Sequence, residues 1–147
     1  MIIDKDLNYK NFLIENKTEL IPISTYGANK LSSESFISAY SHLFNIRALV
    51  FRFANVVGRN QTHGVAFDFK KKLKKNPSFL KVMGNGNQKK SYIDVMDVIK
   101  ATFLAIKKDK NRFSSYNIAN DDAITVKEIL NIVVEDLNIK FPKVKYG

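Results

Sequence analysis

The sequence of 147 residues has no cysteine and only two histidines. Without cysteine there is no disulfide framework, no thiolate zinc site and no cysteine nucleophile. The carboxylates are dispersed rather than gathered at metal-ligand spacing, so no metal site is predicted. No apolar run is long enough to span a bilayer, and the N-terminus has no basic region followed by an apolar stretch. We therefore expect a protein of the cytoplasm.

Arginine is also scarce, because only four of the 24 basic residues are arginines, although the net charge is +10. The densest run is Lys70 to Lys75, and apolar residues at helical spacing (Val65, Ala66, Phe69, Leu73) predict that these lysines lie on a solvated helix face. A nucleic-acid-binding stripe is the alternative. It is disfavoured because bidentate recognition of phosphates and bases uses arginine, and no nucleic-acid-binding motif accompanies the run.

Hydrophobic periodicity predicts alternating helices and strands, which is the pattern of an α/β fold. Residues 1–23 are predicted as a short helix or surface loop, and residues 141–147 as the start of an extended segment with nothing to pair with, so that the chain's end need not be the end of a domain. Between them we first expect a helix over 24–44, a strand over 46–53, a polar loop over 55–64 and a helix from 65 that is closed by Asn76 and Pro77. A strand over 80–83 follows, and its turn at 84–87 lets 89–93 pair back on it. The last expected elements are a helix after Asp94, a strand over 116–119, and a helix opened by a capping box at Thr125 and Glu128.

Tyr26 and Lys30 form the pair that is most suggestive of chemistry. Residues four apart lie on one helix face, where a lysine ammonium stabilises a tyrosine phenolate that can act as an acid or base. With six tyrosines and 20 lysines in the chain, such a spacing also arises by chance.

Three motifs occur in a familiar order over residues 18–147. They are the helix Pro22–Glu34 with Tyr-x-x-x-Lys, the segment Arg52–Gly58 (R-x-x-N-V-x-G) and the segment Gly84–Val98 (G-N-G-N-Q-K-K-S-Y-I-D-V-M-D-V). Together they resemble the NAD-dependent epimerase/dehydratase family of extended short-chain dehydrogenase/reductases, in particular its UDP-glucose 4-epimerase-like members.

The resemblance implies a role for nine residues. Tyr26 would be the acid/base at a sugar hydroxyl while NAD takes the hydride, Lys30 would hold the nicotinamide ribose and favour the phenolate, and Phe53 would sit beside the nicotinamide. The others would bind a nucleotide-sugar substrate such as a UDP-sugar: Asn55 at its phosphates or sugar, Val65, Lys81, Val82 and Met83 at its base, and Lys90 at its diphosphate. The family usually has an arginine at the position of Lys90, and a lysine keeps the charge without the bidentate fork.

Several of these residues also have simpler interpretations. Phe53 is equally explained as a core aromatic, Asn55 as a turn former and Lys90 as a solvated lysine. Asp94 and Asp97 are interpreted as a helix cap and a first-turn carboxylate. His42 and His63 are interpreted as structural or surface residues.

The dinucleotide-binding turn G-x-x-G-x-x-G is missing, as is the family's catalytic Ser or Thr upstream of the tyrosine. The resemblance therefore implies the C-terminal part of a Rossmann-like doubly wound sheet over 24–58, with a substrate-binding α/β region over 59–147 and a poorly defined segment over 1–23. Three functions remain open: part of an NAD-dependent nucleotide-sugar epimerase whose NAD half comes from another chain, a non-catalytic nucleotide-sugar-binding module, and a phosphate-backbone binder. A homodimer is also compatible with the sequence.

Overall fold

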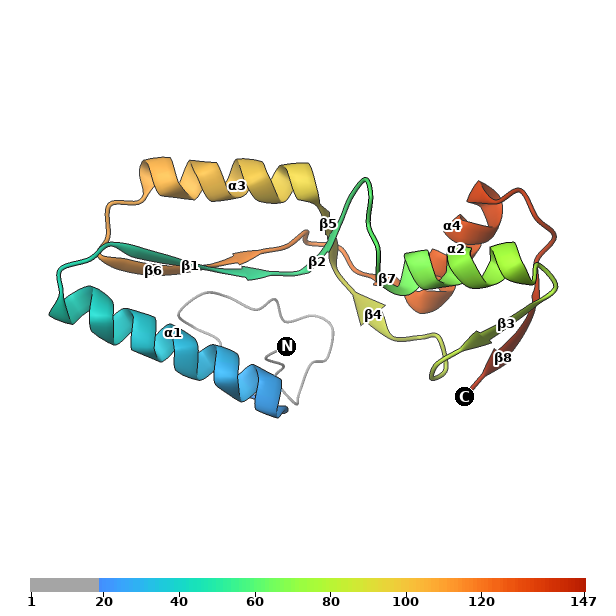
Figure 1. Ribbon diagram of the computed structural model, residues 1–147, viewed down its shortest axis with the longest axis horizontal. Coiled ribbons are helices and arrows are strands. Elements are labelled where there is room, and N and C mark those ends of the chain that lie inside the picture. Colours follow the sequence, from blue (N-terminus) through green and yellow to red (C-terminus); the bar gives the residue numbers. More distant parts are fainter. Residues whose placement is uncertain (1–18) are drawn as a thin grey trace. The chain divides into compact units, whose positions relative to one another are not determined.

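A computed structural model describes residues 19–147, which alternate helices with short strands (Figure 1). These residues form two compact units: unit 1 contains residues 19–53 and 97–118, and unit 2 contains residues 54–96 and 119–147. The elements are α1 (Thr25–Leu43), β1 (Ala48–Phe53), β2 (Asn55–Val57), α2 (Val65–Lys75), β3 (Phe79–Val82), β4 (Lys89–Lys90), β5 (Tyr92–Asp94), α3 (Val95–Lys108), β6 (Phe113–Ile118), β7 (Ile124–Thr125), α4 (Val126–Asp136) and β8 (Lys143–Tyr146).

Unit 1 is built on a parallel pair of strands. β1 and β6 run in register from Ala48 opposite Phe113 to Phe53 opposite Ile118. α1 and α3 lie on opposite sides of this pair (Figure 1). A parallel pair covered by helices is the expected product of an α/β crossover, so the predicted fold class is confirmed.

Helix α1 begins and ends where its sequence predicts. The Ser24 hydroxyl accepts a hydrogen bond from the Gly27 N–H at 3.0 Å and so caps one of the free amides of the first turn. After the cap residue Phe44, Asn45 takes a left-handed conformation with φ of 56°, which asparagine tolerates better than most residues. The prediction of a helix over 24–44 is therefore confirmed. Of the segment 1–23, residues 1–18 lie outside the described part, and residues 19–23 are not helical.

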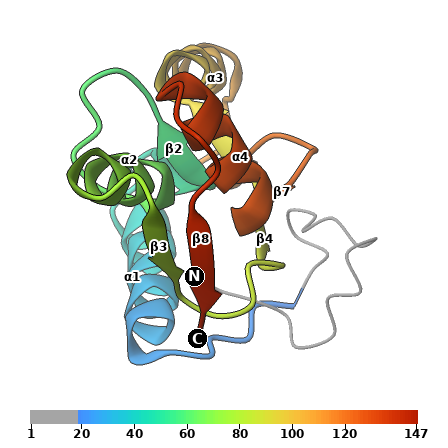
Figure 2. The ribbon, with the colours of Figure 1, turned by 90° about the vertical axis from the view of Figure 1, so that its right-hand side faces the viewer.

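Unit 2 has a closed apolar core between two helices and a sheet. α2 and α4 pack together beside the parallel strands β3 and β8 (Figure 2). Leu73, Leu80, Val82 and Leu130 are each 1% exposed at the centre of this core. At the start of α4, Thr125 and Glu128 exchange the two hydrogen bonds of the predicted capping box.

Strand pairing in unit 2 differs from the predicted hairpin. β3 pairs with β8 in parallel, so residues 89–93 do not pair back on 80–83 and the C-terminal segment is not unpaired. The reason is burial: β3 turns Leu80 and Val82 into the core, and β8 adds the half-buried Val144 beside them, whereas Lys89 and Lys90 have no apolar side chain to add. β4 instead pairs antiparallel with β7.

The loop predicted over 55–64 was also wrong in its first residues. Asn55–Val57 form strand β2, which pairs in parallel with β5. Gly58 ends the strand where the chain passes close to α3: a Cβ at this position would lie 2.6 Å from Cγ1 of Val95. The glycine of the R-x-x-N-V-x-G motif therefore permits a close approach. The assignment of 24–58 and 59–147 to separate functions stays a prediction.

Candidate functional site

Tyr26 and Lys30 lie in the first two turns of α1, with their side chains on one helix face. The Lys30 ammonium is 5.5 Å from the centroid of the Tyr26 ring. Tyr26 is 62% exposed, so its phenol is accessible to a molecule from solution. The ammonium faces the ring in this arrangement, and a role of the pair in proton transfer stays a prediction.

Helix α1 is attached to β1 by a forked ion pair one turn beyond Lys30. Nε of Arg52 lies 3.0 and 3.1 Å from the two carboxylate oxygens of Glu34, and Nη2 lies 2.5 Å from Oε2. The two side chains are only 22% and 14% exposed, which weakens screening by water. The ion pair ties the helix that carries Tyr26 and Lys30 to the strand that ends at Phe53.

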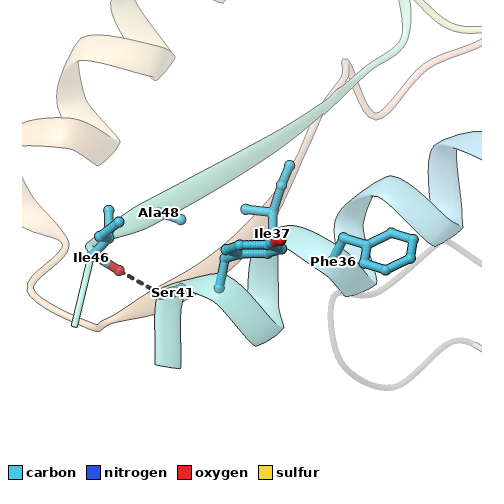
Figure 3. Close-up of a pocket in the computed structure, with 6 residues that line it drawn as sticks. Phe36, Ile37, Ser41, Ile46 and Ala48 are labelled. Atoms are coloured by element: carbon cyan, nitrogen blue, oxygen red, sulfur yellow. Dashed lines mark hydrogen bonds between the residues drawn. The ribbon is translucent and has the colours of Figure 1, made fainter. Parts of the chain in front are cut away.

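A second attachment lies near the C-terminal end of α1, beside a small apolar cavity. The buried Ser41 hydroxyl donates to the carbonyl of Ile46 at 2.6 Å (Figure 3). It also lies 3.0 Å from the carbonyl of Arg112. The cavity, of about 220 Å³, is lined by Phe36, Ile37, Tyr40, Ser41, Ile46 and Ala48. None of the predicted site residues lines it, and its only short polar side chain is engaged with the backbone, so it has no evident chemistry.

Phe53, the residue predicted to face the nicotinamide, ends β1. Its ring stacks on that of Phe51, with centroids 6.3 Å apart, and the residue is 51% exposed. Phe53 is therefore not buried within the described residues. Contact with a cofactor stays a prediction.

Unit 2 contains a cavity of about 210 Å³ that gathers five of the six predicted substrate-binding residues. Val65 comes from α2, Lys81 and Val82 from β3, Met83 from the residue after β3, and Lys90 from β4. The lining also includes residues that the sequence did not indicate: Asp68, Phe69, Lys72, Gln88, Tyr92, Ile124, Val126 and Ile129.

Asn55, the sixth predicted residue, does not line this cavity. Its side-chain amide donates to the carbonyl of Ser91 at 2.9 Å, which joins β2 to the residue before β5. Asn55 is therefore a strand residue and not the turn former of the simpler interpretation. Its contact with a substrate stays a prediction.

The cavity combines an apolar interior with a basic rim. Phe69, Val82 and Ile129 are buried core residues that line it, whereas Lys81 and Lys90 are exposed. Burial raises the pKa of the Tyr92 phenol, so this hydroxyl remains protonated at neutral pH. Such a lining suits a flat, largely apolar ring with an anionic group at the rim.

Among the polar lining residues, Lys72 also pairs with Asp68 along α2, at 3.5 Å. Gln88 donates from its side-chain amide to the carbonyl of Met83 at 3.3 Å. The cavity thus brings three lysines together with one carboxylate, and its net charge favours an anion.

The acidic residues at the start of α3 have structural roles. The Asp94 carboxylate accepts from the N–H of Met96 at 2.7 Å and caps the helix. Asp97 pairs with Lys100 one turn further on, at 3.0 Å. The sequence interpretation of both residues as helix-start carboxylates is confirmed.

Within residues 19–147, no group of three or more histidine or acidic side chains is placed to hold a metal ion. None of the helices in the same range has the length and apolarity needed to cross a bilayer.

Comparison with known proteins identifies the family. Residues 9–119 match the model of the NAD dependent epimerase/dehydratase family, which is more than half of the chain. The chain belongs to this family. The motifs at Tyr26, Arg52 and Gly84 thus predicted it correctly.

Relatives within the NAD dependent epimerase/dehydratase family include "Putative UDP-glucose 4-epimerase" of Methanocaldococcus jannaschii, which is 30% identical over 88% of this chain and 43% of its own length. Two similar solved structures are a UDP-galactose 4-epimerase (37% identity, TM-score 0.80, 90% of this chain, 43% of that one) and the UDP-glucose 4-epimerase of Thermotoga maritima with UDP-glucose (27% identity, TM-score 0.73, 87% and 42%). The chain thus spans less than half the length of these proteins. Their parallel α/β architecture confirms the expected partial Rossmann-like fold.

The residues that the sequence missed carry little individual signal. Phe69 and Ile129 occupy ordinary core positions of amphipathic helices, so their periodicity predicts burial and not a cavity wall. Gln88 is different, because it lies between the two glycines and Lys90 in the third motif. Its place in that motif is the one signal that could have selected it.

Proposed function

We propose that this chain is the substrate-binding and proton-transferring part of an NAD-dependent nucleotide-sugar epimerase or dehydratase, of the UDP-glucose 4-epimerase type. The observation that carries the proposal is the cavity of unit 2, which is lined by five residues that the resemblance to the family implies as substrate-binding. Membership of the NAD dependent epimerase/dehydratase family and a solved relative with UDP-glucose support it.

The cavity would bind the nucleotide part of the substrate. Its volume of about 210 Å³ is below the usual 300–1,000 Å³ of complete ligand sites, and is better matched to a base than to a whole nucleotide-sugar. The base would lie against the apolar lining, with the Tyr92 hydroxyl as a donor. The diphosphate would lie at the rim beside Lys81 and Lys90, where a lysine supplies a point charge instead of an arginine fork.

Tyr26 would exchange a proton with a hydroxyl of the sugar, and Lys30 would stabilise the phenolate that this requires. NAD, when bound, supplies the hydride chemistry of the family. Tyr26, Lys30 and Phe53 are exposed, as residues that touch a nicotinamide nucleotide must be before it binds. The sequence has no glycine-rich dinucleotide turn, so we propose that polypeptide outside these 147 residues, in a separate chain or in further sequence, holds the pyrophosphate of NAD.

Binding of UDP tests the cavity. Isothermal titration of the chain with UDP and with UDP-glucose is expected to give saturable binding. Lys81→Ala and Lys90→Ala are each expected to weaken it by roughly twofold to tenfold, which corresponds to about 0.4–1.4 kcal/mol for a rim lysine. Lys71→Ala is the matched control, since Lys71 is an exposed lysine of α2 that does not line the cavity. An equal loss with Lys71→Ala would mean nonspecific attraction to a basic protein.

Proton transfer is tested by combining the chain with the dinucleotide-binding part of the Methanocaldococcus jannaschii relative and NAD. Restored interconversion of UDP-glucose and UDP-galactose is expected, with loss of at least a hundredfold in rate for Tyr26→Phe. Interconversion that is unaffected by Tyr26→Phe would contradict the assigned role.

Because all residues that line the cavity belong to unit 2, a second function is that of a nucleotide-sugar-binding module without catalysis. In that case UDP-glucose would bind as above, and no combination with a dinucleotide-binding polypeptide would give turnover. The phosphate-backbone binder has less support, because Lys70 and Lys72 of the lysine face are engaged with Asp136 and Asp68. Affinity for duplex DNA that falls steeply with salt, and more steeply than for another protein of equal charge, would favour it.

A further inference from the structure

The turn between β3 and β4 carries one side of the cavity in unit 2. It runs from Gly84 to Gln88, and it is followed at once by β4 with the rim residue Lys90. Gly84 and Gly86 have φ of 72° and 77°, the left-handed region that favours glycine. A turn of this kind has few intrinsic constraints, so its position depends on what it contacts.

The backbone of the turn is bonded to the N-terminus of α4. The N–H of Lys127 donates to the carbonyl of Gly86, and the N–H of Val126 donates to the carbonyl of Gln88, both at 3.1 Å. The first amides of a helix have no partner within the helix and often bind anions. Here the turn takes up two of them.

The side chain of Lys127 adds a further contact with the turn. Its ammonium donates to the side-chain oxygen of Asn87 at 2.8 Å and lies 5.5 Å from the centroid of the Tyr146 ring. Its stem covers the buried Gly86, because a Cβ added there would lie 3.0 Å from Cγ of Lys127 and 2.7 Å from Cε1 of Tyr146. Lys127 does not itself line the cavity.

We propose that Lys127 is a positioning residue for nucleotide binding: by holding the turn Gly84–Gln88 through Asn87, it presents Gln88 and Lys90 to the cavity. This inference rests on the proposed function, since it assigns the cavity to a nucleotide. The ammonium of Lys127 acts on the turn and not on the ligand.

Loss of the ammonium is expected to loosen the turn without unfolding unit 2. The two backbone bonds to α4 remain, and the core around Leu80, Val82 and Leu130 is not touched by the change. The turn would then sample positions in which Gln88 and Lys90 are displaced. Only the fraction of molecules with both residues in place would bind the nucleotide, so the apparent affinity would fall.

The test compares Lys127→Met, which keeps an unbranched stem of similar length, with the control Lys71→Met. UDP is the probe, and three quantities are measured: its Kd by titration, the melting temperature of the free chain, and hydrogen exchange of peptides covering residues 84–90 without ligand. For Lys127→Met we expect a threefold to tenfold weaker Kd, at least threefold faster exchange over 84–90 and a melting temperature within about 2 °C of wild type. Lys71→Met is expected to change none of the three.

Asn87→Ala provides a second variant that removes the same contact from the other side. If Lys127 acts through Asn87, the double variant Lys127→Met/Asn87→Ala weakens UDP binding no more than either single change. Lys127→Arg keeps a donor for Asn87 and is expected to recover at least half of the lost affinity on a logarithmic scale.

The outcomes separate this inference from the proposed function. Wild-type UDP binding together with unchanged Kd and exchange in Lys127→Met overturns the positioning role and leaves the proposed function standing. Additive effects of Lys127→Met and Asn87→Ala also overturn it. If the wild-type chain does not bind UDP, the proposed function fails, and exchange over 84–90 then decides alone whether Lys127 holds the turn.

Discussion

Unit 1 and unit 2 bury very different amounts of apolar side chain, although each contains a parallel strand pair. Among the described residues, nine large apolar side chains are buried in unit 2, including Phe69, Leu80 and Leu130. Unit 1 buries only two, Val98 and Ile118. In unit 2, α2 and α4 close an apolar core over the face of β3 that carries Leu80 and Val82, whereas unit 1 has a helix on each side of its strand pair but buries few side chains between them.

The side chains exposed in unit 1 are those that a core would normally take up. Leu43 is 76% exposed, Phe103 68%, Phe36 67% and Phe44 60%. Exposed apolar surface of this kind is typical of interaction sites, which agrees with the proposal that the dinucleotide-binding part lies outside these residues. All residues that line the proposed nucleotide cavity belong to unit 2, whereas Tyr26 and Lys30 belong to unit 1, which buries few apolar side chains. Under the proposed function, nucleotide binding therefore depends less on further polypeptide than the redox chemistry does.

The largest expected effect comes from truncating a leucine in each unit. Leu130→Ala in α4 removes a side chain that is 1% exposed, and we expect a loss of about 2–5 kcal/mol in the free energy of unfolding. Leu104→Ala in α3 removes one that is 53% exposed, and we expect less than about 1 kcal/mol. Urea unfolding followed by circular dichroism measures both. Equal losses would mean that the surface of unit 1 is covered in solution, for instance by a second copy of the chain.

Removing the forked ion pair is expected to have the next largest effect. Glu34→Ala deletes three hydrogen bonds to the Arg52 guanidinium from a site where both side chains are less than a quarter exposed. We expect a loss of about 1–3 kcal/mol, concentrated in unit 1. Hydrogen exchange of peptides from α1 and β1 measures it, with peptides of α4 as the internal control. Equal acceleration in α4 would show that the two units unfold together.

Acid is expected to weaken each unit through a different carboxylate. Hydrogen bonds from Ser114, Tyr116 and the Asn111 backbone, together with the Arg47 charge, lower the pKa of Asp109 in unit 1. The backbone N–H and the hydroxyl of Thr125 lower the pKa of Glu128 in unit 2. Because each folded pKa lies below the unfolded value of about 4, the stabilisation is present above pH 4 and is lost as the pH falls through the folded value.

The measurement is urea unfolding between pH 5.5 and pH 3, compared among wild type, Asp109→Asn and Thr125→Ala. Asp109→Asn is expected to flatten the pH dependence of the free energy of unfolding of unit 1. Thr125→Ala is expected to flatten that of unit 2. A pH dependence that neither variant reduces would assign acid sensitivity to other carboxylates.

The sequence predicted local features well and long-range pairing poorly. The capping box of Thr125 and Glu128 joins residues three apart, so a short stretch of sequence is enough to predict it. The pairing of β3 with β8 joins segments about 60 residues apart, and nothing within either segment identifies the partner. Strand β2 was missed because Asn55–Val57 are too few residues to show a strand periodicity and stand in a segment that is otherwise polar.

The site was predicted through motifs rather than through physical pattern. Lys81, Val82 and Met83 form an ordinary strand by periodicity, and only their match to positions of the resembled family linked them to Val65 and Lys90. Lys127 is a residue whose proposed role the sequence did not indicate. Its position two residues after a helix cap predicts a solvated lysine, and its contact with Asn87 arises only when the turn docks on α4.

The smallest expected effect comes from the two helix caps. Ser24→Ala removes a single hydrogen bond to the N–H of Gly27 at an exposed position in unit 1, and we expect a loss of about 0.5–1 kcal/mol. Thr125→Ala removes one bond to the N–H of Glu128 and one with its carboxylate, beside the β4–β7 pair, and we expect about 1–2 kcal/mol. Hydrogen exchange in the first turns of α1 and α4 measures both losses.

Because α4 also holds the turn Gly84–Gln88, Thr125→Ala is expected to accelerate exchange in residues 84–90 as well, whereas Ser24→Ala leaves them unchanged. If Ser24→Ala had the larger effect, the stability of unit 1 would depend on α1 more than its few buried residues indicate. The difference in stability between the two units would then have a cause other than the number of buried apolar side chains.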